Sequence, residues 1–136
     1  MPAMKTIHKY LRIFNIILVA LGIFAAGSMA AEAQNTRNWS RKVARGGEME
    51  FQWLNYDEQT CKDRGYARLI VNKKPTLGHY KTVKRKFTQQ GGKCSGKRLS
   101  VLLVYYVAGK KAGRDNTSYT IRGASDIRIN LNMRVY

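Results

Sequence analysis

Acidic side chains and histidines are scarce in this sequence, and their scarcity limits the chemistry that it can carry. The 136 residues include 8 Asp and Glu against 25 Lys and Arg, with only 2 histidines and 2 cysteines. Nothing in the spacing of the scattered acids selects a carboxylate pair for glycoside hydrolysis. Beyond residue 33 the one histidine is His79, and one histidine with two cysteines cannot complete a tetrahedral zinc site. We therefore predict no catalytic residue, no metal site and no cofactor.

The first 33 residues are predicted to be a cleaved signal peptide. A positive segment precedes an apolar run at residues 13–26, and Ala31-Glu32-Ala33 supplies the small residues that signal peptidase requires before its cut. The alternative is a retained membrane anchor, because residues 13–31 approach the roughly 20 residues that span a bilayer. Export directed by this segment, with cleavage after Ala33, would deliver the chain to the periplasm or to the cell exterior. The positive residues are Lys5, His8, Lys9 and Arg12.

Both cysteines follow this segment, and export would place them in an oxidising compartment. We expect Cys61 and Cys94 to form one disulfide, which in the chain-entropy model contributes roughly 4 kcal/mol for a loop of this size. The alternative is two unpaired cysteines that serve as small core residues. Without the leader the formal net charge is about +15, compared with +17 for the whole chain, so the exported part is strongly basic.

No segment of useful length repeats apolar residues at helical spacing, whereas alternation at period two is frequent. Residues 99–107 are apolar on both faces, which is typical of a central strand covered on each side. Clusters of Gly, Asn and Pro separate the alternating runs, which argues for a β-sandwich or a small barrel, and we prefer the sandwich. The predicted strands are residues 48–53, 66–71, 80–87, 99–107, 117–122 and 128–136.

Three parts are thus expected: the signal peptide at residues 1–33, an arm at 34–47 and a sandwich domain at 48–136. The arm is polar and basic without sustained periodicity, and Trp39 could pin it to the domain. The core predicted between the two sheets consists of Phe51, Trp53, Leu69, Val71, Val101, Leu103, Ile121, Leu131 and Met133.

Two motifs in the second half of the chain share a pattern with a known family. One is Pro75-Thr76-Leu77-Gly78, and the other consists of Val104, Tyr106, Gly113, Asp115, Tyr119 and Ile121 at matching offsets. Over about 70 residues this order resembles the bacterial Ig-like, cadherin-like domains of exported proteins, although Ala108 and Thr117 depart from the pattern. The resemblance implies an Ig-like antiparallel β-sandwich of about seven strands that serves as a structural or adhesive module and has no catalytic residue.

Glycine-containing segments between the predicted strands are interpreted as structural turns. Gly113 suits a positive φ, and the Asp115 side chain can cap nearby backbone amides. Residues 91–98 match part of a phosphate-binding loop, but Arg98 stands where a Ser or Thr hydroxyl would hold magnesium. We interpret that segment as a hairpin connection that presents Cys94 to Cys61. The predicted turn residues are Pro75, Gly78, Gly113 and Asp115.

Basic clusters are the remaining functional signal. If the polar faces of neighbouring strands align, they would form a positive surface for a polyanion, and arginines would add bidentate contacts. The alternative is that these charges only keep a small exported protein soluble. Nucleic acid is a weaker candidate, because the tyrosines show no stacking motif. The predicted anion-binding residues are Lys81, Lys84, Arg85, Lys86, Lys97, Arg98, Lys110, Lys111 and Arg114.

These observations favour a non-enzymatic, periplasmic or secreted module. We expect it to contact an anionic envelope component, or a protein partner through a surface or an edge strand. The alternative is a small secreted hydrolase, or a lytic or antimicrobial protein that acts on cell wall or membrane. The oligomeric state is left open.

Overall fold

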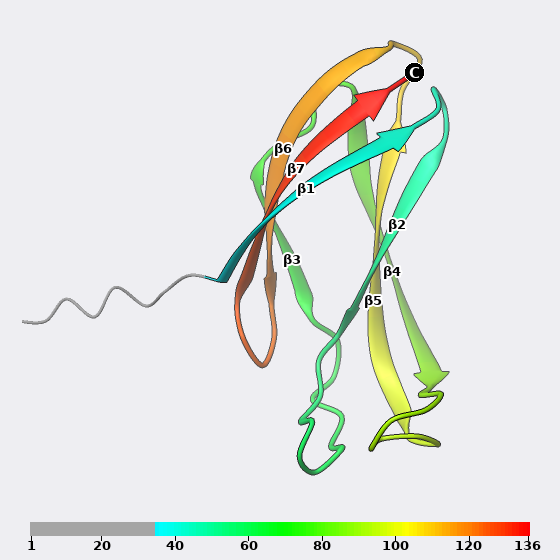
Figure 1. Cartoon of the computed structure of the whole chain (residues 1–136), viewed down its shortest axis with the longest axis vertical. Helices are drawn as coiled ribbons and strands as arrows, with labels where there is room; N and C mark the ends of the chain where they lie inside the picture. Colours follow the sequence, from blue (N-terminus) through cyan, green and yellow to red (C-terminus); the bar gives the residue numbers. More distant parts are fainter. Residues whose placement is uncertain (1–34) are drawn as a thin grey trace, which may run out of the picture. The chain divides into compact units, whose positions relative to one another are not determined.

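A computed structural model describes residues 35–136, which form two β-sheets (Figure 1). The first sheet has the order β1 (Asn35–Val43), β7 (Ile127–Val135), β6 (Gly113–Arg122) and β3 (Arg68–Lys73). The second has the order β2 (Glu48–Leu54), β5 (Arg98–Ala108) and β4 (Gly78–Thr88). Within the described residues no helix is long and apolar enough to cross a membrane. The predicted signal peptide, residues 1–33, lies outside the described residues.

The predicted all-β sandwich with seven strands and one disulfide is confirmed. Each strand predicted from alternation is present, and most extend by a few residues beyond the predicted bounds. Strand β6 begins at Gly113 rather than at residue 117, and its first half pairs with β7 from Gly113 opposite Val135. This half was missed because its inward residue Asp115 is charged rather than apolar. All strand pairs are antiparallel except β1 with β7, which run parallel.

The prediction of an arm at residues 34–47 is wrong for the part that forms β1. This nine-residue strand pairs with β7 along its whole length, from Asn35 opposite Ile127 to Val43 opposite Val135. Trp39 stacks on Phe51 at 5.5 Å between ring centres, so β1 is part of the sandwich. Arg37 and Arg41 occupy inward positions of β1, because inward side chains of an edge strand can reach solvent. Their charge removed the alternation of apolar and polar residues from this part of the sequence. The sandwich therefore includes β1 and is not confined to residues 48–136.

The side of strand β5 that faces the core is the opposite of the one predicted. Leu102 and Val104 belong to the core cluster, whereas Val101 and Leu103 are buried on the outer side of the β2–β5–β4 sheet. Periodicity could not choose between the two sides because both are apolar. Val71, also predicted to be in the core, is 38% exposed because it lies on the edge strand β3 beside a register shift.

Aromatic side chains fill the centre between the sheets. The ring of Tyr119 lies 5.3 Å from that of Tyr80 and 6.3 Å from that of Trp53, each in an edge-on arrangement. Burial raises the pKa of Tyr80 to about 12, so its hydroxyl stays protonated and donates to Thr117. The core cluster consists of Val43, Phe51, Trp53, Ala67, Leu102, Val104, Tyr106, Ala108, Tyr119, Ile121, Ile129, Leu131, Met133 and Val135.

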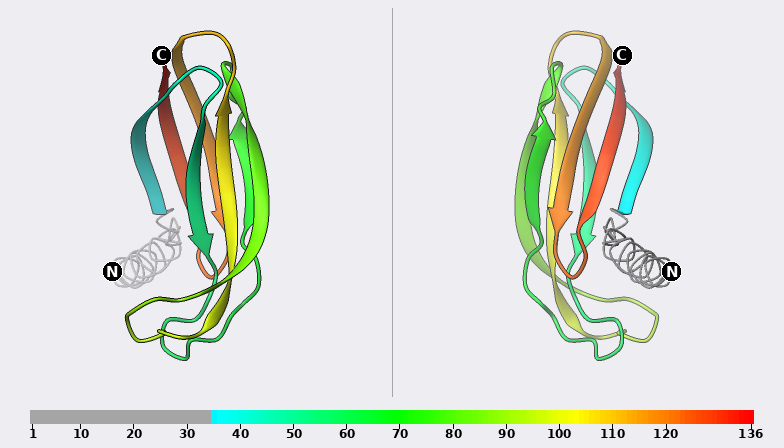
Figure 2. Two further views of the ribbon diagram at one scale, coloured as in Figure 1. Left: turned by 90° about the vertical axis from the view of Figure 1, so that its right-hand side faces the viewer. Right: turned by 90° about the vertical axis from the view of Figure 1, so that its left-hand side faces the viewer.

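At one end of the domain, β4 and β5 extend beyond the other sheet. The connections β2–β3 and β4–β5 lie together at this end (Figure 2), and the predicted Cys61–Cys94 disulfide joins them. Asp63 adds a polar anchor, since it accepts hydrogen bonds from Lys86 Nζ and from Ser100 Oγ, both at 2.7 Å. The bond from Lys86 holds the pKa of Asp63 well below its usual value. This is the disulfide end of the domain.

Candidate anion-binding surface

The predicted cations of β4 lie on opposite sides of their strand. Lys81 and Arg85 are on the outer side, and Lys81 Nζ forms an ion pair with Glu48 at 2.7 Å. Lys84 and Lys86 are on the inner side, where their Nζ atoms lie 5.5 and 5.7 Å from the centre of the Tyr66 ring. The four residues therefore do not form one continuous positive surface.

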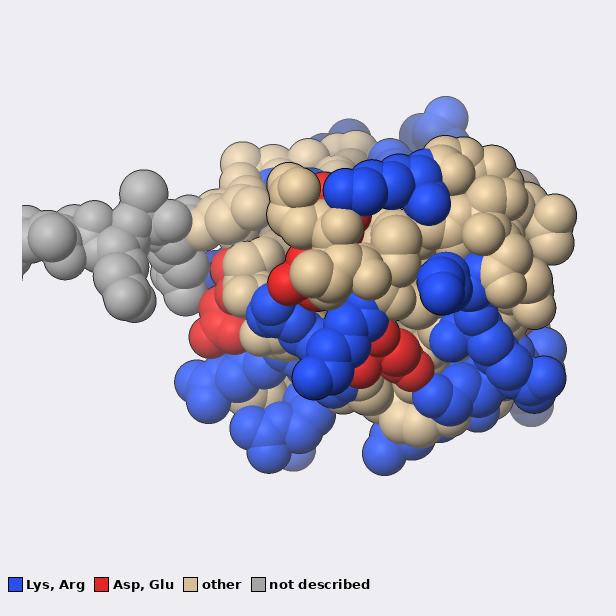
Figure 3. All heavy atoms as spheres, turned by 90° about the horizontal axis from the view of Figure 1, so that it is seen from below, with Lys and Arg blue, Asp and Glu red and all other residues tan. Residues whose placement is uncertain are grey.

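The other predicted cations are divided between the two ends of the domain. Lys97 and Arg98 lie at the disulfide end, where Arg98 pairs with Thr88 at the end of β4. Lys110 and Lys111 lie about 34 Å away at the opposite end, judged from the length of the paired strands. There they line a pocket of about 400 Å³ with residues 76–79 and Gly109. A view of the disulfide end shows Lys and Arg over much of its surface, with Asp and Glu among them (Figure 3).

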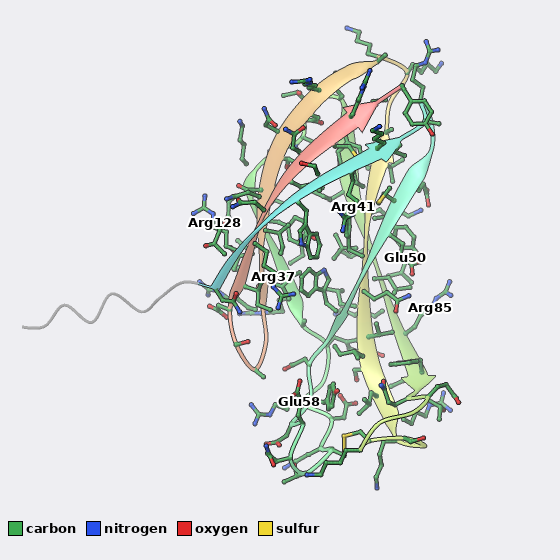
Figure 4. The ribbon with its side chains drawn as sticks, viewed as in Figure 1. Arg37, Arg41, Glu50, Glu58, Arg85 and Arg128 are labelled. Atoms are coloured by element: carbon green, nitrogen blue, oxygen red, sulfur yellow. A yellow bond between two sulfur atoms is a disulfide. The ribbon has the colours of Figure 1, made fainter. Side chains whose placement is uncertain are left out.

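A surface that the sequence-based prediction missed lies on the outer side of strands β1, β7 and β6. Figure 4 shows Arg128 on this side of β7 and Arg37 on the opposite side, which faces β2. We call this surface the polar face. It consists of Thr36, Asn38, Ser40, Lys42, Arg128, Asn130, Asn132, Arg134, Arg114 and Asn116, together with Ser118 and Thr120, whose side chains are buried.

No acidic and no aromatic side chain belongs to the polar face. The only acid in its three strands is Asp115, which points inward and is 0% exposed. On the β2–β5–β4 sheet, in contrast, Glu48 and Glu50 lie on the outer side of β2. Acids therefore offset positive charge on the outer side of β2. On the other sheet, Asp126 of the β6–β7 connection pairs with Arg122 at the end of β6 far from Arg114, and β1, β7 and β6 themselves have no outward-facing acid.

Three cations lie side by side at one end of the polar face. Lys42 is opposite Arg134, and Arg134 is opposite Arg114, so the three cross β1, β7 and β6 in a single row. Adjacent strands are about 4.8 Å apart, which places the three attachment points within about 10 Å. None of them makes an ion pair among the described residues. Like charges directly opposite each other destabilise a sheet, and a bound anion would remove that repulsion. We call these residues the cationic row.

Amide and hydroxyl side chains occupy the next two rows of the polar face. Ser40, Asn132 and Asn116 lie opposite one another directly beside the cationic row. In the following row, Asn130 Nδ2 donates a 2.9 Å hydrogen bond to Asn38 Oδ1, which joins β7 to β1. These rows present both donors and acceptors to solvent.

Asp115 holds the end of the domain beneath the cationic row. Its carboxylate accepts hydrogen bonds from the Tyr106 hydroxyl at 2.7 Å and from the amides of Leu77 and Thr76 at 2.9 and 3.0 Å. Burial alone raises the pKa of Asp115, but these hydrogen bonds outweigh it and the pKa lies below its usual value. The carboxylate is therefore ionised, and hydrogen bonds from Tyr106, Leu77 and Thr76 compensate its charge.

The predicted turn residues belong to several elements rather than to one turn. Asp115 lies within β6 and caps amides of the β3–β4 connection, which contains Pro75, rather than amides of its own turn. Gly113 begins β6 with a φ of +149°. Gly78 begins β4, where a Cβ would overlap the carbonyl oxygen of Val107.

The other carboxylates are held by structural contacts. Glu50 accepts a 2.6 Å hydrogen bond from the Tyr105 hydroxyl, which lowers the pKa of Glu50. Asp57 caps the amides of Thr60 and Gln59 and forms a 3.0 Å ion pair with Arg64, and the amide hydrogen bonds lower the pKa of Asp57 most. Among residues 35–136 there is no group of three or more His, Cys, Asp or Glu that could hold a metal ion.

Comparisons with known proteins add one structural likeness. No protein-family model and no curated protein matches this sequence. A search of solved structures finds the solution structure of amebosin at a TM-score of 0.43 and 11% identity, over 76% of this chain and 98% of amebosin. A likeness at that TM-score supports no conclusion about fold or function, and the resemblance to Ig-like domains stays a prediction.

Proposed function

We propose that this chain is an exported, non-enzymatic module that binds an anionic polymer through its polar face. The observation that carries the proposal is the cationic row: Lys42, Arg134 and Arg114 stand opposite one another, and their three strands have no acid on that side. Repulsion within the row costs stability, which an anionic ligand would recover. Solubility alone would be served by cations that are spread apart.

Other features of the chain agree with an exported binding module. A disulfide is typical of proteins in oxidising compartments, and the predicted leader would deliver the chain to the periplasm or the cell exterior. An anionic polymer of the cell envelope is the partner that such a protein meets there. The hydrolytic alternative has less support, because the carboxylates of Glu50, Asp57 and Asp63 are ionised and engaged in structural contacts.

The experiment compares two triple variants with equal loss of charge. In the first, Lys42, Arg114 and Arg134 are replaced by glutamine. In the control, the exposed cations Lys62, Lys93 and Lys97 of the disulfide end are replaced in the same way. Binding of each protein to dextran sulfate is measured by calorimetry over a range of salt concentrations.

Each cation near an anionic surface contributes about 1 kcal/mol, so loss of the cationic row should weaken binding about 100-fold at low salt. The control should lose less than about fivefold, because it removes only a distant contribution to the field. The affinity of the wild type should fall steeply as salt rises. Equal losses in the two triple variants would show that only net charge matters and would contradict the proposal.

A further inference from the structure

We infer that the anionic polymer is a polysaccharide, whose hydroxyl groups are bound by the amide and hydroxyl rows beside the cationic row. This inference rests on the proposed function and names its ligand class. The row of Ser40, Asn132 and Asn116 immediately adjoins the three cations. A chain laid along β7 would therefore meet charged and uncharged polar side chains within one contact.

The chemistry of these side chains suits a ligand that both donates and accepts hydrogen bonds. An asparagine amide offers two donors and one acceptor, and a serine hydroxyl offers both functions. Lysine and arginine only donate, which is sufficient for phosphate, sulfate or carboxylate. A surface selected for charge alone would have no need of acceptors, whereas a sugar chain has hydroxyl donors at every unit. The combination indicates anionic groups carried on a hydroxylated chain.

The order of side chains along β7 indicates how long a segment of the polysaccharide the strand could contact. Arg134, Asn132, Asn130 and Arg128 lie on the same side of the strand, so a ligand that follows β7 meets a cation at each end and two amides between them. Same-side neighbours are about 7 Å apart, and the whole series covers about 20 Å. The hydrogen bond from Asn130 to Asn38 holds one of these amides in place before any ligand binds.

The polar face is poorly suited to nucleic acid. Proteins that bind single strands stack bases on aromatic side chains, and the twelve-residue set that defines the polar face has none. Duplex DNA is read by a helix or a two-stranded ribbon that enters a groove. A sheet face of several strands is too broad for this, so it could contact only the phosphates.

The test uses polymers that separate charge from hydroxyl groups. Polygalacturonate has carboxylates on hydroxylated rings, poly(acrylate) has carboxylates without hydroxyls, and single-stranded poly(dT) represents nucleic acid. At equal charge concentration, wild-type protein should bind polygalacturonate at least tenfold more tightly than the other two. Dissociation constants from calorimetry or interferometry check this order.

Variants then connect the preference to the amide row. The double variant Asn116→Ala with Asn132→Ala should bind polygalacturonate about tenfold more weakly and poly(acrylate) unchanged. Both positions are exposed, so the fold should tolerate the change. The matched control is Gln59→Ala with Gln90→Ala, which removes two exposed amides at the disulfide end and should leave both affinities unchanged.

The outcomes separate this inference from the proposed function. If the cationic-row variant loses binding but the amide variant does not, or if poly(acrylate) or poly(dT) binds as tightly as polygalacturonate, the polysaccharide inference is wrong and polyanion binding stands. If the cationic-row variant binds every polymer as its control does, the proposed function is wrong, and this inference is wrong with it.

Discussion

The substitution Asp115→Asn tests how the two sheets are joined at the end of the domain beneath the cationic row. The Asp115 carboxylate is 0% exposed and accepts hydrogen bonds from Tyr106 in β5 and from Leu77 and Thr76 in the β3–β4 connection. It thus connects one sheet to the other. In asparagine one of the two acceptor oxygens becomes an NH₂ donor that cannot replace it.

The expected cost follows from these contacts. The Thr76 amide donates to both oxygens, at 3.0 and 3.1 Å, so in asparagine it keeps at most one acceptor and faces the new NH₂ donor, which costs about 1 to 3 kcal/mol. The hydrogen bonds that persist are no longer charge-assisted, which adds about 1 kcal/mol. We expect Asp115→Asn to lower the free energy of unfolding by about 3 kcal/mol near pH 7, out of a typical total of about 5 to 15 kcal/mol.

Acidification should remove this difference. Because the folded pKa of Asp115 lies below the unfolded value, its stabilisation is present above the unfolded pKa of about 3.9 and is lost as pH falls through the folded pKa. Urea unfolding followed by circular dichroism, at about pH 7 and again below about pH 3, measures both quantities.

The matched control is Asp126→Asn. Asp126 is an exposed acid at 3.5 Å from Arg122, so its replacement should cost less than about 1 kcal/mol. A cost below about 1 kcal/mol for Asp115→Asn near pH 7, or a cost that does not shrink in acid, would refute the account of the buried carboxylate.

Three further changes test other parts of the fold. Trp39→Ala should cost about 2 kcal/mol and alter tryptophan fluorescence, because the half-buried indole stacks on Phe51. Gly78→Ala should cost about 3 kcal/mol in urea unfolding, because the new Cβ overlaps the Val107 carbonyl. Replacing Cys61 and Cys94 by alanine should cost about 4 kcal/mol by the entropy of the closed loop, with thiol titration confirming that the wild type has no free thiol.

Each of these changes has a result that contradicts its reasoning. A Trp39→Ala protein as stable as the exposed-site variant Ser40→Ala would mean that β1 contributes nothing to the core. Gly91→Ala is the comparison for Gly78→Ala, because Gly91 has a positive φ and open space around it, and it should cost roughly 1 kcal/mol. If Gly78→Ala costs no more than that, the close approach of β4 to β5 is contradicted. Two reactive thiols in native protein would exclude the disulfide.

Local alternation of apolar and polar residues was sufficient to predict the strands whose two sides differ in polarity. In β7, Ile129, Leu131 and Met133 alternate with polar residues, and the strand was predicted within one or two residues of its bounds. Strand β1 was missed because arginines at 37 and 41 occupy inward positions at the edge of the sandwich, where their charged ends reach solvent. The inward side of β5 was not predictable because a strand apolar on both sides has no polarity to read.

The candidate site was less predictable than the fold. Arg114 alone among the predicted anion-binding residues belongs to the cationic row, and its neighbours Arg134 and Lys42 come from opposite ends of the described chain. The alternation in this segment is sufficient to place Arg128, Asn130, Asn132 and Arg134 on one side of a strand. It could not indicate which strands lie beside that side.

By itself, the sequence determined the all-β class, most strands and the single disulfide, because side-chain direction alternates locally and two cysteines allow one pairing. Only the tertiary structure decided that β1 lies parallel beside β7 and that β6 lies on its other flank. Such pairings join residues as much as 92 positions apart. The charge of a sheet face is the sum over neighbouring strands, so the polar face exists only once those strands have paired.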